Sequence, residues 1–399
     1  MEPSNPSLIP IVKGHQLARY VKDVYRAKAG IYTRDMLVKL EKDLSSAKPG
    51  QLIEIPCMNG GFKTEEVPAR PDGPHAEYIT KINMLNIHQM VERAETAFAS
   101  GFLEDEGYRF TFTDEQKTII TCPITFSTVP KNAKQHDLLR LENAWNRGWL
   151  NWGGNSVHKA LIQSLKTLGP KMPEISKVLC LELGPLGGFK GDLLFAERAD
   201  DSQARYRSIN QHMFAATLAK ALSDRFGKRV ALMASDPEYT ENDKKILSSS
   251  GVKIIEGFGA LSLTEIDSKT LVVSFNPTFP LKQIICDFAK PAAIIWGMSA
   301  TKLNTMDQNR EGRSSRTRKL GEYYDEYLIA KEPIRFGKIN LCIRKPIIDN
   351  LANAIETNLV LSEPNGMAKP GCGNTHVDDM DEAVMVDYES EDEWVVLDE

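Results

Sequence analysis

The chain of 399 residues lacks the features that would assign it to a membrane, a secreted or a metal-bound class. No apolar run approaches the roughly 20 residues needed to cross a bilayer. Its first residues lack the basic start and apolar stretch of a secretory signal. The six cysteines have no short paired spacing, and the seven histidines are equally dispersed. We therefore expect a cytoplasmic protein without a disulfide framework and without a metal site.

Two nucleotide-binding fingerprints are also missing. The glycines of Gly184-Pro-Leu-Gly-Gly188 do not have the spacing of a dinucleotide-binding turn, and no Gly-Lys-Ser/Thr follows them to make a phosphate-binding loop. An oxidoreductase or a methyltransferase on the same kind of fold is therefore a weaker interpretation. The small residues of this turn would let a ligand approach its backbone N–H groups closely. A tight turn without a ligand is the alternative.

Charge is distributed unevenly along the chain. The formal net charge is −5, although residues 378–399 contain 11 acidic residues and no lysine or arginine. Without that segment the rest of the chain carries +6, so a mildly basic body precedes an acidic tail. Such a body is compatible with an RNA partner, and we expect neither a membrane nor a DNA partner. Proline, glycine and acidic residues from Glu363 onward predict poor order.

Short apolar runs alternate with helical patterns in the middle of the chain. The runs that predict strands are residues 178–183, 229–235, 252–255, 270–275, 292–296 and 338–344. Strands separated by helices imply right-handed crossovers and therefore a parallel sheet. The sequence thus predicts an α/β protein with a Rossmann-like, mostly parallel sheet flanked by helices, an N-terminal α+β extension and a disordered acidic C-terminal tail.

We found no internal repeat and no Gly/Ser linker that divides the chain cleanly. We expect an N-terminal helical or α+β extension over residues 1–150, a Rossmann-like domain over 151–345, and a C-terminal segment over 346–399. In the extension, Thr33 is expected to cap a helix, another helix should cover about 78–101, and strands are expected at 109–113 and 117–123. The helically spaced Trp145, Trp149 and Trp152 indicate packing more than base stacking.

Residues with useful chemistry follow three of the predicted strands. In parallel sheets, ligands bind outside the carboxyl ends of the strands. We therefore expect one crevice surrounded by Glu182, Gly184, Gly187, Gly188, Asp236, Tyr239, Asp243 and Asn276. Asp236 could accept hydrogen bonds from an amine or a ribose, and Tyr239 could relay a proton. If a helix begins near Pro237, the alternative is that Asp236 only caps it.

A basic cluster follows the last parallel strand. It consists of Arg310, Arg313, Arg316, Arg318 and Lys319, interleaved with glycine and serine. Clustered arginines bind a phosphate backbone because they release its counterions, so these residues are candidates for RNA contact. A solvated loop is the alternative interpretation.

Three segments resemble a known family. Leu179-Cys-Leu-Glu-Leu-Gly184, the Asp236-Pro-Glu-Tyr-Thr stretch with Asp243, and the segment from Phe275-Asn-Pro to Gly297 are similar to the sensitivity-to-red-light-reduced-like domain, over about residues 175–300. That family is mostly known as regulatory proteins of unclear chemistry. The long N-terminal extension and the acidic tail resemble a fungal branch, the arginine-containing cyclodipeptide synthases.

The fungal resemblance implies an activity and further site residues. In that branch an Asp-Asp-x-x-Glu motif is associated with activity, and Asp378, Asp379 and Glu382 fit the motif here. Carboxylates at this spacing could grip an arginyl guanidinium. The implied substrates are aminoacyl-tRNAs, including arginyl-tRNA, with no cofactor, and the product is a cyclic dipeptide of secondary metabolism. Chance agreement within an acidic stretch is the alternative for this motif.

The implied mechanism is acyl transfer between two charged tRNAs. Bacterial cyclodipeptide synthases use a serine nucleophile just after the first strand, whereas this chain has glycine, proline and leucine there. We therefore expect direct aminolysis, with Asp236 or Tyr239 moving protons. The competing hypothesis is a non-catalytic regulator that binds a nucleotide or a partner protein.

Overall fold

The computed structural model describes residues 9–28, 30–68, 78–101, 103, 111–131, 133, 135–188, 201–275, 277–298, 314–332 and 336–346. All of them lie in the first of two compact units, Met1–Pro346. The acidic segment 378–399 and its Asp378, Asp379 and Glu382 are outside the described residues, as is Asn276.

A seven-stranded sheet forms the centre of this unit, with the order β10-β11-β9-β8-β5-β6-β7. Its parallel strands are β5 (Lys177–Leu181), β6 (Ala231–Ser235), β7 (Lys253–Ile254), β8 (Thr270–Ser274) and β9 (Ala293–Met298). The hairpin of β10 (Tyr324–Glu332) and β11 (Gly337–Arg344) joins β9 in the antiparallel direction. The predicted α/β class with a mostly parallel sheet is therefore confirmed.

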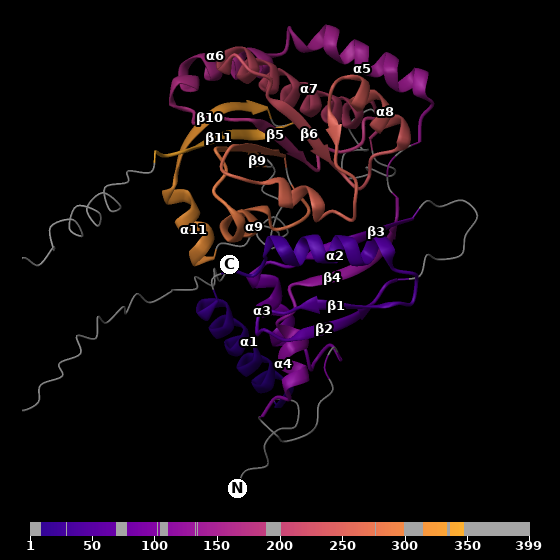
Figure 1. Cartoon of the computed structure of the whole chain (residues 1–399), viewed down its shortest axis with the longest axis vertical. Helices are drawn as coiled ribbons and strands as arrows, with labels where there is room; N and C mark the ends of the chain where they lie inside the picture. Colours follow the sequence, from indigo (N-terminus) through magenta and orange to yellow (C-terminus); the bar gives the residue numbers. More distant parts are fainter. Residues whose placement is uncertain are drawn as a thin grey trace, which may run out of the picture. The chain divides into compact units, whose positions relative to one another are not determined.

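Both faces of the sheet are buried, as expected for parallel strands. Along β5, Val178 and Cys180 belong to one hydrophobic core, and Leu179 and Leu181 belong to the other. The helices that contribute to the first core are α5 (Leu138–Trp152), α6 (Ser156–Leu168), α7 (Asp201–Phe226) and α8 (Glu241–Ser249). They lie together on one side of the sheet in Figure 1.

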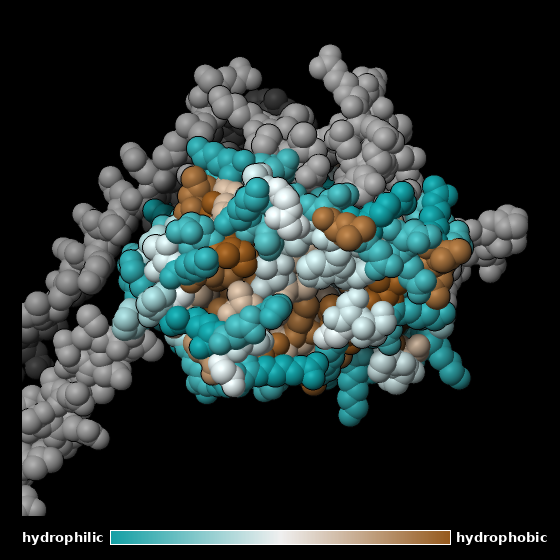
Figure 2. Space-filling model, turned by 90° about the horizontal axis from the view of Figure 1, so that it is seen from above, coloured by the Kyte–Doolittle hydropathy of each residue, from teal (hydrophilic) through white to brown (hydrophobic). Residues whose placement is uncertain are grey.

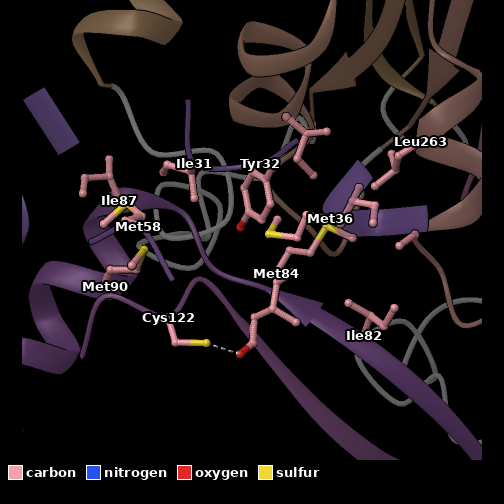
Figure 3. Packing of buried hydrophobic residues seen from close by; sticks show 14 of the residues in the cluster. Ile31, Tyr32, Met36, Met58, Ile82, Met84, Ile87, Met90, Cys122 and Leu263 are labelled. Carbon is pink, nitrogen blue, oxygen red and sulfur yellow. Dashed lines mark hydrogen bonds between the residues drawn. The ribbon is translucent and has the colours of Figure 1, made fainter. Parts of the chain in front are cut away.

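The other face of the sheet packs against shorter helices and an N-terminal layer. The helices are η2 (Leu261–Glu265), α9 (Leu281–Phe288) and α11 (Ser315–Glu322), and η1 (Gly169–Lys171) precedes β5. The N-terminal layer contains α1 (Ile9–Ala27), α2 (Arg34–Ser46), β1 (Leu52–Pro56), β2 (Phe62–Glu66), β3 (Tyr78–Met84), α3 (Ile87–Thr96), α4 (Asp114–Ile120) and β4 (Ile124–Pro130). Figure 3 shows Tyr32, Met36 and Met84 of this layer in one cluster with Leu263 of η2.

The helix expected after Thr33 is present, and the Thr33 side chain accepts a hydrogen bond from the Met36 N–H. Two other local predictions are wrong. Residues 78–84 form β3, because the β-branched side chains of Ile79, Thr80 and Ile82 favour a strand. Helix α3 begins only after the capping box of Asn86. The strand expected at 117–123 is largely α4, which a capping box between Thr113 and Gln116 starts.

Three carboxylates join the N-terminal layer to the sheet half of the unit. Glu41 of α2 accepts N–H bonds from the loop after β7, and Asp287 of α9 accepts the N–H groups of Ile31 and Tyr32 at 2.7 and 3.1 Å. Glu238, after β6, accepts hydrogen bonds from Lys81 of β3 and from the Ala133 N–H, both at 3.1 Å. These contacts hold β3 opposite the ends of the parallel strands.

Helices α1 and α3 pack closely because residue 14 has no side chain. A Cβ atom on Gly14 would lie 2.1 Å from the backbone oxygen of Glu95. We expect Gly14→Ala to lower the free energy of unfolding by about 1–3 kcal/mol, because the two helices must move apart. Gly153→Ala is the control, since nothing lies within 4 Å of its Cβ position. Urea denaturation measures both, and equal effects of the two substitutions would contradict this account.

The outer surface over α5 and α6 is mostly hydrophilic with separate hydrophobic areas (Figure 2). On α5, Leu139 and Leu150 are 67% and 82% exposed, whereas Trp145 and Trp152 are buried. The packing interpretation thus holds for those two tryptophans, and Trp149 is 40% exposed. Within the described ranges, no helix is long and apolar enough to cross a membrane.

Candidate functional site

The structure brings together the segments that follow β5 and β6. The Gly184 N–H donates to Oδ2 of Asp236 at 2.8 Å, and the Leu186 N–H donates to Oδ1 of Asp243 at 3.1 Å. The segment after β8 also reaches this edge, because the N–H and hydroxyl of Thr278 donate to the two carboxylate oxygens of Glu182 at 2.5 and 2.7 Å. Three strand ends therefore meet, as the parallel topology requires.

The glycine turn after β5 uses its backbone donors internally. Gly184 and Leu186 donate to the two aspartates, and the Gly188 N–H donates to the Pro185 carbonyl. The Gly187 carbonyl contacts Nε2 of His136 at 3.3 Å. The expected approach of a ligand to the N–H groups of this turn is therefore blocked at these three donors.

No helix begins at Pro237, so the alternative in which Asp236 caps such a helix does not hold. The chain makes a turn there, in which the Tyr239 N–H donates to the Asp236 carbonyl, and α8 begins at Glu241 with Thr240 as its cap. Asp243 completes a capping box, because its Oδ2 accepts the N–H and hydroxyl of Thr240 at 2.8 Å. Asp243 is fully buried, so it supports the turn and is not a surface acid.

A buried polar chain runs behind the turn. The Tyr239 hydroxyl lies 2.7 Å from Nε2 of His212, whose Nδ1 lies 2.8 Å from the Ser208 carbonyl. Because a carbonyl only accepts, Nδ1 carries the proton and the Tyr239 hydroxyl donates to Nε2. The Ser208 hydroxyl in turn donates to the Gly184 carbonyl. Sequence reasoning missed His212 and Ser208, which lie one turn apart on α7.

Burial sets the protonation states of this chain. Desolvation lowers the pKa of His212 to about 4 and raises the pKa of Tyr239 well above its usual value. Both groups are therefore neutral near pH 7. The hydrogen bonds of Tyr239 and His212 stabilise the turn after β6, and Tyr239 has almost no contact with solvent, since it is only 2% exposed.

We expect Tyr239→Phe to lower the free energy of unfolding by about 1–3 kcal/mol, because Nε2 of His212 would be left buried without a donor. Thermal unfolding measures this loss. Tyr323→Phe is the control, since that ring is exposed. A variant of unchanged stability that loses only its activity would instead assign Tyr239 to proton relay.

Asp236 is the ionisable group of this edge whose pKa lies near neutrality. Burial and, next, the nearby negative charge of Glu182 raise its pKa to about 7, against the opposing effect of N–H bonds from Glu238 and Gly184. A carboxyl group with this pKa can take up and release a proton at physiological pH.

A cleft opens beside these carboxylates, between β3 and the ends of the parallel strands. Its cavity volume is about 180 Å³. The strand ends contribute Glu182, Ser235, Pro237 and Thr278, β3 contributes Lys81 and Met84, and the loop after β7 contributes Phe258 and Ser262. Enclosed pockets for drug-sized ligands hold roughly 300–1,000 Å³, so this cleft suits one moiety of a larger ligand. Among the residues described, no group of three potential metal ligands gathers.

The basic cluster is only partly described. Arg316 lies in α11, with its guanidinium 4.1 Å from the ring centre of Tyr25, paired with Asp287 and hydrogen-bonded to the Tyr25 and Lys28 carbonyls. These internal contacts occupy Arg316 and connect α11 to α1. Arg318 and Lys319 are exposed on α11, and Arg310 and Arg313 are outside the described residues.

Comparison with curated proteins found no match, and comparison with solved structures found none either. A scan against family models matched residues 160–354, a range that starts in α6, includes the whole seven-stranded sheet and ends before the acidic motif at 378–382. This match supports the family resemblance of the three segments that follow β5, β6 and β8, since all of them lie within the matched range. The chain carries an SRR1 domain.

Proposed function

We propose that this protein is a tRNA-dependent arginine-containing cyclodipeptide synthase, which joins arginyl-tRNA and a second aminoacyl-tRNA into a cyclic dipeptide. The observation that supports it most is the pKa of about 7 for Asp236, which stands between Ser235 and Pro237 in the sequence, two residues that line the cleft together with Glu182. Aminolysis of an ester needs a base of this strength, because the attacking amine is an ammonium ion at neutral pH.

The chemistry balances without a cofactor. The amine of one aminoacyl group attacks the ester carbonyl of the other, so that an amide bond forms and the first tRNA leaves with its 3′-terminal hydroxyl. The ammonium nitrogen loses two protons as it becomes an amide: one passes by way of Asp236 to the leaving oxygen, and the other is released to solvent. The free amine of the dipeptidyl ester next attacks its own ester carbonyl, which releases the second tRNA and the diketopiperazine. Holding both esters in one site supplies the proximity that the reaction needs.

The acidic motif and the basic cluster have roles in this proposal. Asp378, Asp379 and Glu382 would bind the arginyl guanidinium, since planar carboxylate partners suit its forked donors. Exposed Arg318 and Lys319, together with Arg310 and Arg313, would contact the tRNA backbone. We assign no such role to Arg316, because its guanidinium already has internal partners.

The test is product formation. The full chain is incubated with arginyl-tRNA, a mixture of other aminoacyl-tRNAs and no added cofactor, and the products are analysed by mass spectrometry. We expect a cyclic dipeptide that carries the isotope label of the arginine. Formation should fall sharply in Asp236→Asn and remain near the native rate in Asp224→Asn, whose side chain is exposed on α7.

The alternative is a non-catalytic regulatory protein with an SRR1 domain. The hydrogen bonds that Asp236 and Asp243 accept from the N–H groups of the glycine turn favour this hypothesis, because they give both residues a structural role. A folded, monodisperse protein that yields no cyclic dipeptide with any charged tRNA would favour the regulator.

A further inference from the structure

Two buried thiols lie together in the N-terminal layer, in a part of the molecule that the proposed reaction does not use. Cys57 directly follows β1 and is 3% exposed, and Cys122 lies two residues before β4 and is fully buried. Both belong to the same hydrophobic core, and both are free thiols. They are 65 positions apart in the chain, so a search of the sequence for short paired spacings does not find them.

A backbone hydrogen bond holds the two segments together. The Met58 N–H donates to the Thr121 carbonyl at 3.0 Å, so the chain neighbours of the two cysteines are in direct contact. Bonds of this kind keep two backbones roughly 5 Å apart. A disulfide joins residues whose Cα atoms are about 4.4–6.8 Å apart, so these two segments need little movement to accept one.

The two thiol groups are also in contact with each other. The Cys57 thiol donates a hydrogen bond to the sulfur of Cys122. The Cys122 thiol lies 3.2 Å from the Ile124 carbonyl, a contact that Figure 3 shows among the surrounding apolar side chains. Because a hydrogen bond joins the two sulfur atoms directly, they are already positioned to approach each other.

The surroundings favour the thiolate form of Cys122 over that of Cys57. The hydrogen bond from Cys57 lowers the pKa of Cys122, against the opposing effect of burial. The positive charges of Lys63 and Arg93 lower the pKa of Cys122 further. The same hydrogen bond and, next, burial raise the pKa of Cys57. Cys122 is therefore the nucleophile of the pair, and Cys57 is the thiol that reacts second.

We propose that Cys57 and Cys122 form an oxidisable dithiol, which a peroxide converts into a disulfide within the folded chain. This inference goes beyond the proposed function and does not depend on it. A small oxidant suits the site, because the sulfur atoms become accessible only when the surrounding core opens locally. Where glutathione keeps thiols reduced, a disulfide of this kind is transient and senses the redox state.

The reaction balances with hydrogen peroxide as the oxidant. The Cys122 thiolate attacks one peroxide oxygen, the O–O bond breaks, and the departing hydroxide takes up a proton to become water. The Cys57 sulfur then attacks the sulfenic acid on Cys122. The S–S bond forms, the S–O bond breaks, and the hydroxyl leaves as water with the proton of the Cys57 thiol. In total the two thiols lose two electrons, and the peroxide gains them.

Oxidation of the native chain tests the pair directly. The full chain is treated with hydrogen peroxide, alkylated after unfolding, digested without reductant and analysed by mass spectrometry. We expect a linked pair of peptides that contain Cys57 and Cys122, with a mass two hydrogens below the sum of the two. Two of the six thiols should be lost, and dithiothreitol should restore them.

Single variants assign the link to this pair. Cys57→Ala and Cys122→Ala should each abolish the linked peptides. Cys342→Ala is the matched control, because Cys342 is also a buried thiol, 4% exposed in β11, and this variant should form the link as the native chain does. The measurement on the native chain stands by itself if either of the first two variants does not fold.

The disulfide is also expected to raise the melting temperature of the full chain by roughly 3–6 °C, because it restricts a long loop in the unfolded state. Thermal unfolding of the peroxide-treated chain, before and after reduction, measures this shift. A melting temperature of the linked chain at or below that of the reduced chain would contradict the native geometry of the link.

The same treatment in concentrated urea shows what an unfolded chain does, and there we expect a mixture of links among the six cysteines. The proposal would be overturned if the native chain gave that same mixture. It would equally be overturned if the native chain lost no thiols at peroxide concentrations that oxidise free cysteine, or if Cys122 were oxidised without becoming linked to Cys57.

Discussion

Glu41→Ala is expected to lower the free energy of unfolding by about 3–5 kcal/mol, the range for removing one partner of a buried charged network. The Glu41 carboxylate, 6% exposed, accepts the N–H groups of Phe258, Ala260 and Leu261 at 2.9, 2.7 and 2.8 Å. Without it, these donors remain pointed into a space that no other acceptor fills, and an alanine leaves a cavity there.

Urea denaturation of the full chain measures this loss. Glu92→Ala is the control, because Glu92 is exposed on α3, and we expect it to change stability by less than about 0.5 kcal/mol. Since Phe258 and Ser262 line the cleft, the Glu41 variant should also bind cleft ligands less tightly at temperatures where it remains folded. A loss of stability below 1 kcal/mol would mean that water or another side chain replaces the carboxylate.

Asp236→Asn is expected to reduce cyclic dipeptide formation at pH 7 by roughly 10²- to 10⁴-fold, the usual contribution of a general base. The native rate should rise with pH as Asp236 ionises around its pKa of about 7. The Asn variant should lack that rise, because its side chain does not titrate. Product formation at several pH values under single-turnover conditions measures both, and a native profile without an inflection near 7 would contradict the assignment.

Asp236→Asn is also expected to change how the free energy of unfolding depends on pH, whether or not the protein is an enzyme. The pKa of Asp236 is raised from 3.8 to about 7, so the folded state favours the protonated form. The stabilisation is fully present below about pH 4 and is lost as the pH rises towards and through 7. The full shift corresponds to roughly 4 kcal/mol, and partial exposure of the side chain reduces our expectation to about 1–3 kcal/mol.

Denaturant titrations between pH 4 and pH 8 measure this loss as the difference between the native chain and Asp236→Asn. Asp224→Asn, in an exposed pair with Lys220, should keep the native pH dependence. If the native chain and Asp236→Asn respond to pH in parallel, Asp236 ionises in the fold as it does in the unfolded chain, and its role as a base at neutral pH loses its support.

The sequence by itself determined the parallel sheet and the position of its strand ends. Apolar runs between helical patterns predict buried strands. Right-handed crossovers through the helices make these strands parallel, so their carboxyl ends lie at one edge of the sheet. This reasoning led to Glu182, Gly184, Asp236 and Asp243, which the structure brings to the same edge. Such predictions succeed because they depend on local periodicity and on a handedness that all L-amino acids share.

Only the tertiary structure decided what those residues contact. The glycine turn resembles an open anion site until Asp236 and Asp243, more than 50 residues away, are seen on its N–H groups. Likewise, the wall of the cleft depends on Glu41, some 217 positions from Phe258 in the chain. Hydrogen bonds between distant segments leave no periodic signal in the sequence, because each requires only one polar residue at the right place in space.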